Sequence, residues 1–134
     1  MIAVDTSIVV AAFASWHEGH ASAAGILRKN PRVPAHVLIE TYSVLTRLPP
    51  PHRAAADIVA TFLLECVTEA PLALPPRAHL SLIEAAAAAG IAGGSIHDAL
   101  IAVTAKHAHA RLLSRDRRAV AVYERLGADY ELIL

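Results

Sequence analysis

The order of apolar and polar positions along this chain predicts strands that alternate with helices. Short apolar runs predict buried strands at 1–4, 111–114 and 130–134, a brief strand at 33–35 and a weak one at 72–74. Helical spacing predicts helices at 8–14, 17–29, 36–48, 51–67, 78–89, 96–109 and 119–126. This alternation predicts an α/β fold in which a parallel sheet lies between helical layers.

Turn and cap residues set the expected limits of these elements. Pro49 to Pro51 must interrupt the helix at 36–48, and Pro51 suits the first turn of the helix that follows. Ser95 is expected to cap the helix at 96–109, whose middle is apolar all round and therefore predicted to be central. Gly127 is expected to end the last helix.

Two helices carry more apolar surface than a chain of this size needs. At 36–48, one face is apolar, and the opposite polar stripe contains Glu40. The helix that runs to about residue 67 adds further apolar surface. Surface of this kind commonly marks a partner site.

Composition adds limits to this picture. With 134 residues, no internal repeat and no linker, the chain is expected to form a single domain over 1–134. No apolar run approaches the roughly 20 residues that span a bilayer, and the N-terminus does not resemble a secretory signal. We therefore expect a soluble cytoplasmic protein. A formal net charge of zero argues against coating nucleic acid by bulk electrostatics, and the lone Cys66 excludes an intrachain disulfide.

Four carboxylates stand where such a fold could bring them together. Asp5 and Asp116 follow predicted parallel strands, and ligands bind beyond the carboxyl ends of such strands. Asp98 leads into the apolar helix at 96–109, where it loses hydration. Several carboxylates at one point repel each other unless a dication compensates, and Mg²⁺ or Mn²⁺ prefers such oxygen ligands.

Each acid also has an ordinary structural explanation. Asp5 and Asp116 could simply cap the helices that follow them. Asp98 stands three residues after Ser95, which is the spacing of a capping box, and Glu40 could be a solvated surface residue. The joint pattern favours the metal-site hypothesis, although these alternatives stay open at this point.

Four motifs in order resemble the PIN domain, and their spacing is most similar to the VapC-type ribonuclease toxins of prokaryotic toxin–antitoxin pairs. They are Val4-Asp5-Thr6-Ser7, Ile39-Glu40-Thr41-Tyr42, Ile96-His97-Asp98-Ala99-Leu100-Ile101-Ala102 and Leu112-Leu113-Ser114-Arg115-Asp116-Arg117-Arg118-Ala119. The resemblance covers essentially the whole chain. It implies a three-layer α/β/α sandwich around a central parallel sheet.

The resemblance also implies a site and a reaction. It makes Asp5, Glu40, Asp98 and Asp116 the catalytic quartet of an Mg²⁺-dependent endoribonuclease, with Mn²⁺ as an alternative. Asp5 and Asp98 are the expected direct metal ligands, Asp116 joins them directly or through water, and Glu40 positions a water or a second ion. Ser114 is expected to support the quartet.

Partners and rival functions follow from the same resemblance. It implies transfer RNA or ribosomal RNA as substrate, a cognate antitoxin that docks on the apolar helices between 36 and 67, and a homodimer. The alternatives are a catalytically inactive PIN-like binding module and a metal-dependent phosphatase. The phosphatase is disfavoured because residue 7 is Ser and breaks the Asp-x-Asp pattern.

Basic and aromatic residues have less specific roles. Arg115, Arg117 and Arg118 could hold RNA phosphates, although the last two could equally be solvated helix residues. Trp16 and Tyr42 could stack on a base, but a core or interface position is favoured. The eight histidines contain no zinc-binding pattern and are expected to have surface or packing roles.

Overall fold

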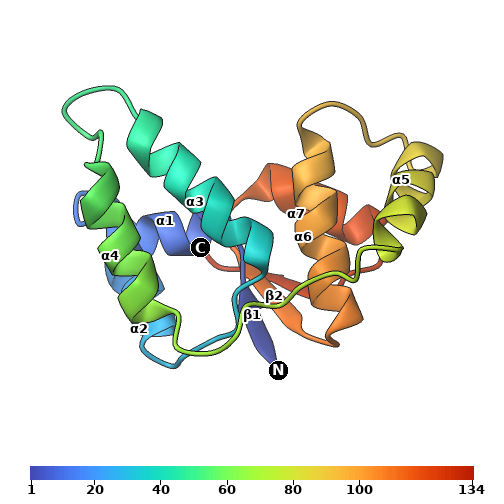
Figure 1. Cartoon of the computed structure of the whole chain (residues 1–134), viewed down its shortest axis with the longest axis horizontal. Coiled ribbons are helices and arrows are strands. Elements are labelled where there is room, and N and C mark those ends of the chain that lie inside the picture. Colours follow the sequence, from blue (N-terminus) through green and yellow to red (C-terminus); the bar gives the residue numbers. More distant parts are fainter.

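A computed structural model describes all residues, 1–134, and shows helices and strands close to the predicted positions (Figure 1). The elements in chain order are β1 (Ile2–Val4), α1 (Thr6–Phe13), α2 (His20–Leu27), α3 (Ala35–Arg47), α4 (Ala56–Cys66), α5 (Ala78–Ala88), α6 (Ser95–His107), β2 (Arg111–Ser114), α7 (Arg117–Arg125) and β3 (Tyr130–Leu132).

The three strands form one parallel sheet in the order β1-β2-β3. Val4 pairs with Leu113, and Ser114 pairs with Leu132, so the carboxyl ends of all three strands lie at the same edge. The predicted parallel sheet is therefore confirmed, and it brings the N-terminus beside a segment more than half the chain away.

The two weaker strand predictions were wrong. Residues 33–35 and 72–74 contribute only an isolated bridge between Pro34 and Leu72, and Arg32 makes a second bridge to Ala3. Pro34 has no backbone N–H to donate, and Pro71 and Pro75 flank the other segment, so neither stretch can extend a ladder.

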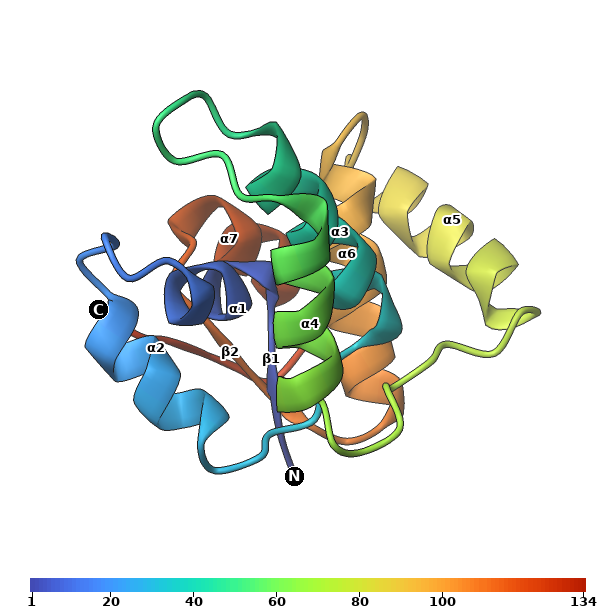
Figure 2. The same ribbon diagram turned by 60° about the vertical axis from the view of Figure 1, so that its left-hand side comes forward.

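Helices lie on both sides of the sheet. In Figure 1, α1 to α4 gather on one side of the strands and α5 to α7 on the other, in agreement with the predicted three-layer sandwich. Figure 2 shows α3 beside α6, and residues of these two helices are in contact. A main core cluster of 19 buried residues surrounds the sheet, and six further residues form a smaller cluster beneath α5.

Two helix starts differ from the prediction. Pro51 does not begin a helix: the chain stays non-helical until Ala56, because consecutive prolines supply no N–H and disfavour helical backbone in the residue before each ring. In this loop, the N–H of Ala54 donates to the carbonyl of Leu45, which returns the chain to α3. Ser95 is the first residue of α6 instead of its cap, since Gly94 occupies the cap position without a side-chain bond.

A third helix begins later than expected. α2 starts at His20 and not near residue 17, because residues 14–19 form a hydrogen-bonded turn. Gly127 ends the last helix as predicted, with a φ of 71° that favours glycine. None of the helices is both long and apolar enough to cross a membrane.

Candidate active site

The register of the parallel sheet brings the first and last acids of the quartet to the same edge. The N–H of Asp5 donates to the carbonyl of Leu113 at 3.1 Å, which continues the ladder one residue beyond Val4. Asp5 thus lies next to the end of β2, which Ser114 closes and Asp116 follows. The predicted meeting of two strand ends is what the structure shows.

Asp5 is almost fully buried, with 2% of its surface exposed. Its Oδ1 accepts from the N–H groups of Ser7 and Ile8 and from the Ser7 hydroxyl, and its Oδ2 accepts from the Tyr123 hydroxyl at 2.8 Å. Burial raises the pKa of Asp5 above its ordinary range, and the surrounding hydroxyls and N–H groups lower it. Asp5 therefore caps α1, which confirms the capping alternative. Its second oxygen, however, binds the buried Tyr123 hydroxyl, a contact that a helix cap at the surface does not need.

Ser7 joins the two strand ends. Its hydroxyl donates to Asp5 at 2.6 Å, accepts from the N–H of Arg115 at 2.7 Å and lies 3.4 Å from the Ser114 hydroxyl. Ser114 in turn accepts from the N–H of Asp116 at 3.0 Å. The predicted supporting residue Ser114 thus contacts the acid segment, and Ser7 links that segment to Asp5.

Asp116 caps α7, as the capping alternative in the sequence analysis expects. Its Oδ1 accepts from the N–H groups of Arg118 and Ala119 at 2.9 and 3.3 Å. Its other oxygen makes no such bond and remains available to a ligand in the cleft beside it. Capping and a role in the site are therefore compatible at this residue.

Asp98, in the first turn of α6, is half-buried and strongly affected by the other acids. Burial, followed by the charges of Glu40, Asp116 and Asp5, raises the pKa of Asp98 from its ordinary value of 3.8 to about 6. Its capping-box alternative is wrong, because no side chain caps α6. The charges of the other three acids therefore all act on the Asp98 carboxyl.

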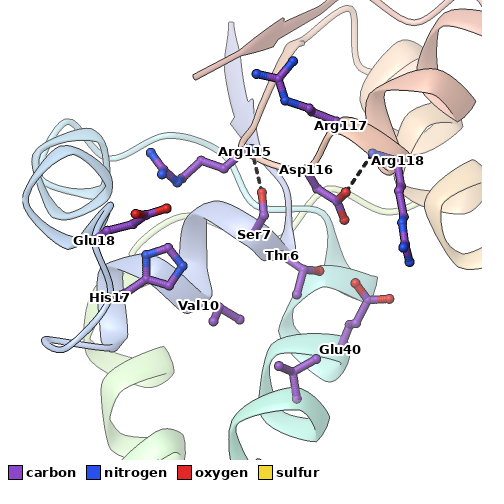
Figure 3. Close-up of a pocket in the computed structure, with 11 residues that line it drawn as sticks. Thr6, Ser7, Val10, His17, Glu18, Glu40, Arg115, Asp116, Arg117 and Arg118 are labelled. Atoms are coloured by element: carbon purple, nitrogen blue, oxygen red, sulfur yellow. Dashed lines mark hydrogen bonds between the residues drawn. The ribbon is translucent and has the colours of Figure 1, made fainter. Parts of the chain in front are cut away.

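An open cleft of about 660 Å³, lined mostly by polar residues, lies beside Glu40 and Asp116, whereas Asp5 and Asp98 do not line it. Figure 3 shows the carboxylates of Glu40 and Asp116 pointing into it, together with the Thr6 hydroxyl. The Thr6 Oγ1 is buried and has no hydrogen-bond partner. The oxygens that face a ligand in the cleft are therefore those of the Glu40 and Asp116 carboxylates.

The three arginines at the end of β2 also line the cleft. Arg115 and Arg118 flank Asp116, while Arg117 extends away from Glu40 (Figure 3). The Arg115 guanidinium packs so closely on Gly19 that a Cβ at position 19 would overlap it unless the arginine moved. Arg115 thus lies against the turn before α2 at the cleft rim.

In their present orientations the acids do not enclose an ion. No group of three His, Cys, Asp or Glu side chains is spaced to hold a metal. Metal-free carboxylates repel one another, and both oxygens of Asp5 are engaged with its own donors. The ligand set Asp5, Asp98 and Asp116 therefore stays a prediction.

Comparison with known families agrees with this geometry. The sequence profile of the PIN domain matches residues 2–125. The chain belongs to the PIN-domain family. The family resemblance expected from the four motifs is therefore confirmed.

Named relatives of this PIN domain include two ribonucleases of Mycobacterium tuberculosis. Ribonuclease VapC40 is 48% identical over 133 residues, covering 99% of this chain and 99% of its own length. Ribonuclease VapC27 is 39% identical over 127 residues, covering 94% of this chain and 92% of its own length.

Solved structures share the fold at much lower identity. A structure of FitAB bound to an IR36 DNA fragment matches with a TM-score of 0.72 and 14% identity, covering 98% of this chain and 94% of that chain. VapBC2 from Rickettsia felis, bound to a DNA fragment from its promoter, matches with a TM-score of 0.67 and 17% identity over the whole of both chains. These similarities extend to the fold alone.

Two residues of the PIN-domain site escaped the sequence analysis. Ser7 directly follows the Asp5-Thr6 pair and is a plausible cap partner from its spacing, but its bond to the Arg115 N–H spans 108 positions. Tyr123 belongs to the apolar face of α7 by pattern, and only the packing of that helix on the sheet brings its hydroxyl to Asp5. Burial and the negative charge of Asp5 raise the pKa of Tyr123, so this hydroxyl remains a donor.

Two histidines meet at the edge of the site. Nδ1 of His97 and Nε2 of His36 lie 3.0 Å apart, and the same His36 nitrogen lies 3.9 Å from Glu40. Burial lowers the pKa of His36, while the nearby Glu40 charge raises it. His97 thus has a hydrogen-bonding role between α3 and α6, as the packing interpretation of the histidines expects.

Proposed function

We propose that this chain is a VapC-like endoribonuclease that hydrolyses RNA phosphodiesters with Mg²⁺, or alternatively Mn²⁺. The observation that carries the proposal is the grouping of Asp98 with Glu40, Asp116 and Asp5: burial, followed by the charges of these three acids, raises the pKa of Asp98 to about 6. The family membership and the two relatives named as ribonucleases support the same reaction.

The residues suit a hard divalent cation. The donors are carboxylate oxygens, and burial together with the neighbouring negative charges raises the pKa of Asp98, both of which a bound dication would offset. We assign Asp5, Asp98 and Asp116 as the ligands and Glu40 as the residue that orients water in the cleft. When bound, the ion supplies Lewis-acid activation of water and neutralises charge on the phosphate oxygens.

The protein's own groups supply position and charge. Ser7 and Tyr123 hold the Asp5 carboxylate in one orientation, and an ion would bind through the lone pairs that these donors leave free. Arg115 and Arg118 flank Asp116 and are placed to hold the phosphates on either side of the cut bond. Arg117, which extends away from Glu40, is assigned a weaker role in RNA binding.

The test is cleavage of structured RNA with and without Mg²⁺. We expect Asp5→Asn and Asp98→Asn each to lower the cleavage rate on the order of a thousandfold, because each removes a charged metal ligand. Asp57→Asn is the matched control, since it removes an exposed carboxylate from the first turn of α4. Its rate should equal that of the unmodified protein.

Each contrary result points to a named alternative. Cleavage that persists in both variants would exclude the metal site, and absence of cleavage by the unmodified protein would favour the inactive binding module. Hydrolysis of small phosphate esters only would favour the phosphatase. Mapping the 5′ ends produced in cells would identify the substrate as transfer RNA or ribosomal RNA.

We further propose that an antitoxin covers the exposed apolar side chains of α3 and α4 and that the chain forms a homodimer. Ile39, Ile58 and Leu64 are 68%, 56% and 81% exposed, which is unusual for such residues on neighbouring helices. A structural neighbour, VapBC2, is a complex in which this fold occurs. The predicted cytoplasmic location and single domain over 1–134 remain predictions.

A further inference from the structure

Trp16 is half exposed, although it is the only tryptophan in the chain. Its indole stacks on the imidazole of His52, with ring centroids 3.9 Å apart and planes tilted by 30°. Trp16 lies in the turn between α1 and α2, and His52 lies in the proline-rich loop between α3 and α4. This aromatic pair joins two loops at the surface and belongs to neither core cluster.

Hydrogen bonds hold the turn that carries Trp16. The N–H of His17 donates to the carbonyl of Ala14 at 2.9 Å, and the N–H of Gly19 donates to Nδ1 of His17 at the same distance. A ring nitrogen of His20 lies 3.0 Å from the carbonyl of Ala11. The indole is therefore positioned before any ligand arrives, which lowers the entropic cost of binding to it.

The same turn reaches the catalytic cleft. His17 and Glu18, which directly follow Trp16, line that cleft with Glu40 and Asp116. The side chain of Arg115 extends toward them (Figure 3), and its guanidinium packs against Gly19. The Arg115 guanidinium thus packs against the same turn that carries the half-exposed ring of Trp16, although the two residues come from different segments.

We propose that Trp16, supported by His52, is a stacking platform for an unpaired base of the RNA strand near the cut bond. Exposed aromatic rings beside a positive groove are the usual means of holding single-stranded nucleic acid, since every base has a π face. The inference rests on the proposed ribonuclease function and adds how the substrate strand is held. It predicts tolerance to base identity, because stacking recognises no particular base edge.

The single tryptophan allows a direct test. Asp98→Asn protein, which should not cleave, is titrated with a fluorescein-labelled single-stranded RNA while indole emission and RNA anisotropy are recorded. We expect the emission of Trp16 to be quenched with the same midpoint as the anisotropy change. Trp16→Ala in the same background should weaken RNA binding by about tenfold, and Trp16→Phe, which keeps a smaller ring, should weaken it less.

Leu80→Ala is the control, because it removes an exposed apolar side chain from α5, which does not line the cleft. Its RNA affinity should equal that of the Asp98→Asn parent.

Two results together would overturn the platform while leaving the ribonuclease proposal intact. These are RNA binding without a change in indole emission, and an unchanged RNA affinity in Trp16→Phe and Trp16→Ala. Absence of both RNA binding and cleavage by the unmodified protein would overturn both. If Trp16→Ala fails to fold, the emission titration and Trp16→Phe still decide.

Discussion

Asp98 is half-buried and lies near three other carboxylates, and both conditions raise its pKa. Its half-burial and the negative charges of Glu40, Asp116 and Asp5 all favour the neutral acid, which places its pKa at about 6. The group therefore changes charge just below neutral pH. A dication and a proton must compete for the site in that range.

We expect this competition to be visible as a pH-dependent stability of the metal-free protein. The folded pKa of about 6 exceeds the ordinary 3.8, so the stability that Asp98 contributes is present below pH 3.8 and is lost as the pH rises through about 6. Relative to Asp98→Asn, the free energy of unfolding of the unmodified protein should fall by roughly 1 kcal/mol over this range, a value reduced for the half exposure of the group.

Urea denaturation in the presence of a chelator, at pH about 5 and about 7, measures this difference. Asp57→Asn serves as the control, because its exposed carboxylate lies away from the site. Equal pH dependence in all three proteins would show that Asp98 is not affected by the neighbouring acids.

At the scale of elements, the site depends on how the ends of β1 and β2 are joined. Ser7 in the first turn of α1 connects Asp5 to the backbone of Arg115 and lies near Ser114. The position of Asp116 therefore depends on a hydroxyl that the sequence places on a different element. Helix caps alone would hold each acid separately and would not fix the distance between them.

Ser7→Ala should consequently lower both stability and activity. It removes the hydroxyl that accepts from the Arg115 N–H and donates to Asp5, so we expect a loss of about 2 kcal/mol in the free energy of unfolding. Chemical denaturation gives this value, and RNA cleavage gives the loss of activity. Ser81→Ala on the exposed face of α5 is the control and should change neither. Unaltered stability in Ser7→Ala would contradict the linking role.

At the scale of the whole molecule, two separate packing events assemble the acid cluster. The parallel pairing of β1 with β2 joins Asp5 and Asp116, while the contact of α3 with α6 brings Glu40 toward Asp98. The acids come from both helical groups and from the sheet edge, so no fragment of the chain contains the site. Metal binding should therefore be coupled to the folding of the entire domain.

Mg²⁺ should stabilise the folded chain through this coupling. At about ten times its dissociation constant, an ion that binds only the native state adds about 1.4 kcal/mol to the free energy of unfolding. Thermal unfolding at pH about 7.5, above the pKa of Asp98, should show a rise in Tm with Mg²⁺ that a chelator reverses. Asp5→Asn and Asp98→Asn should each remove the rise, whereas Asp57→Asn should keep it. An equal shift in every variant would indicate nonspecific ion effects.

Local pattern was sufficient for most elements of this protein. The strands at 1–4, 111–114 and 130–134 and the order of the helices follow from apolar periodicity, because these segments bury one face or both. The fold class followed from their alternation. The proline-rich loop was mispredicted because Pro51 suits a helix start locally, whereas the consecutive prolines and the hydrogen bond of Ala54 to Leu45 in α3 keep the chain non-helical until Ala56.

The sequence by itself determined the family and which acids are candidates for the site, because both follow from the order of four motifs along the chain. Only the tertiary structure decided how those acids are held. The bond of Tyr123 to Asp5, the link from Ser7 to Arg115 and the pairing of Trp16 with His52 join residues distant in the chain. Periodicity reports whether a side chain is buried, but a hydroxyl or a ring acquires its partner only when separate elements pack together.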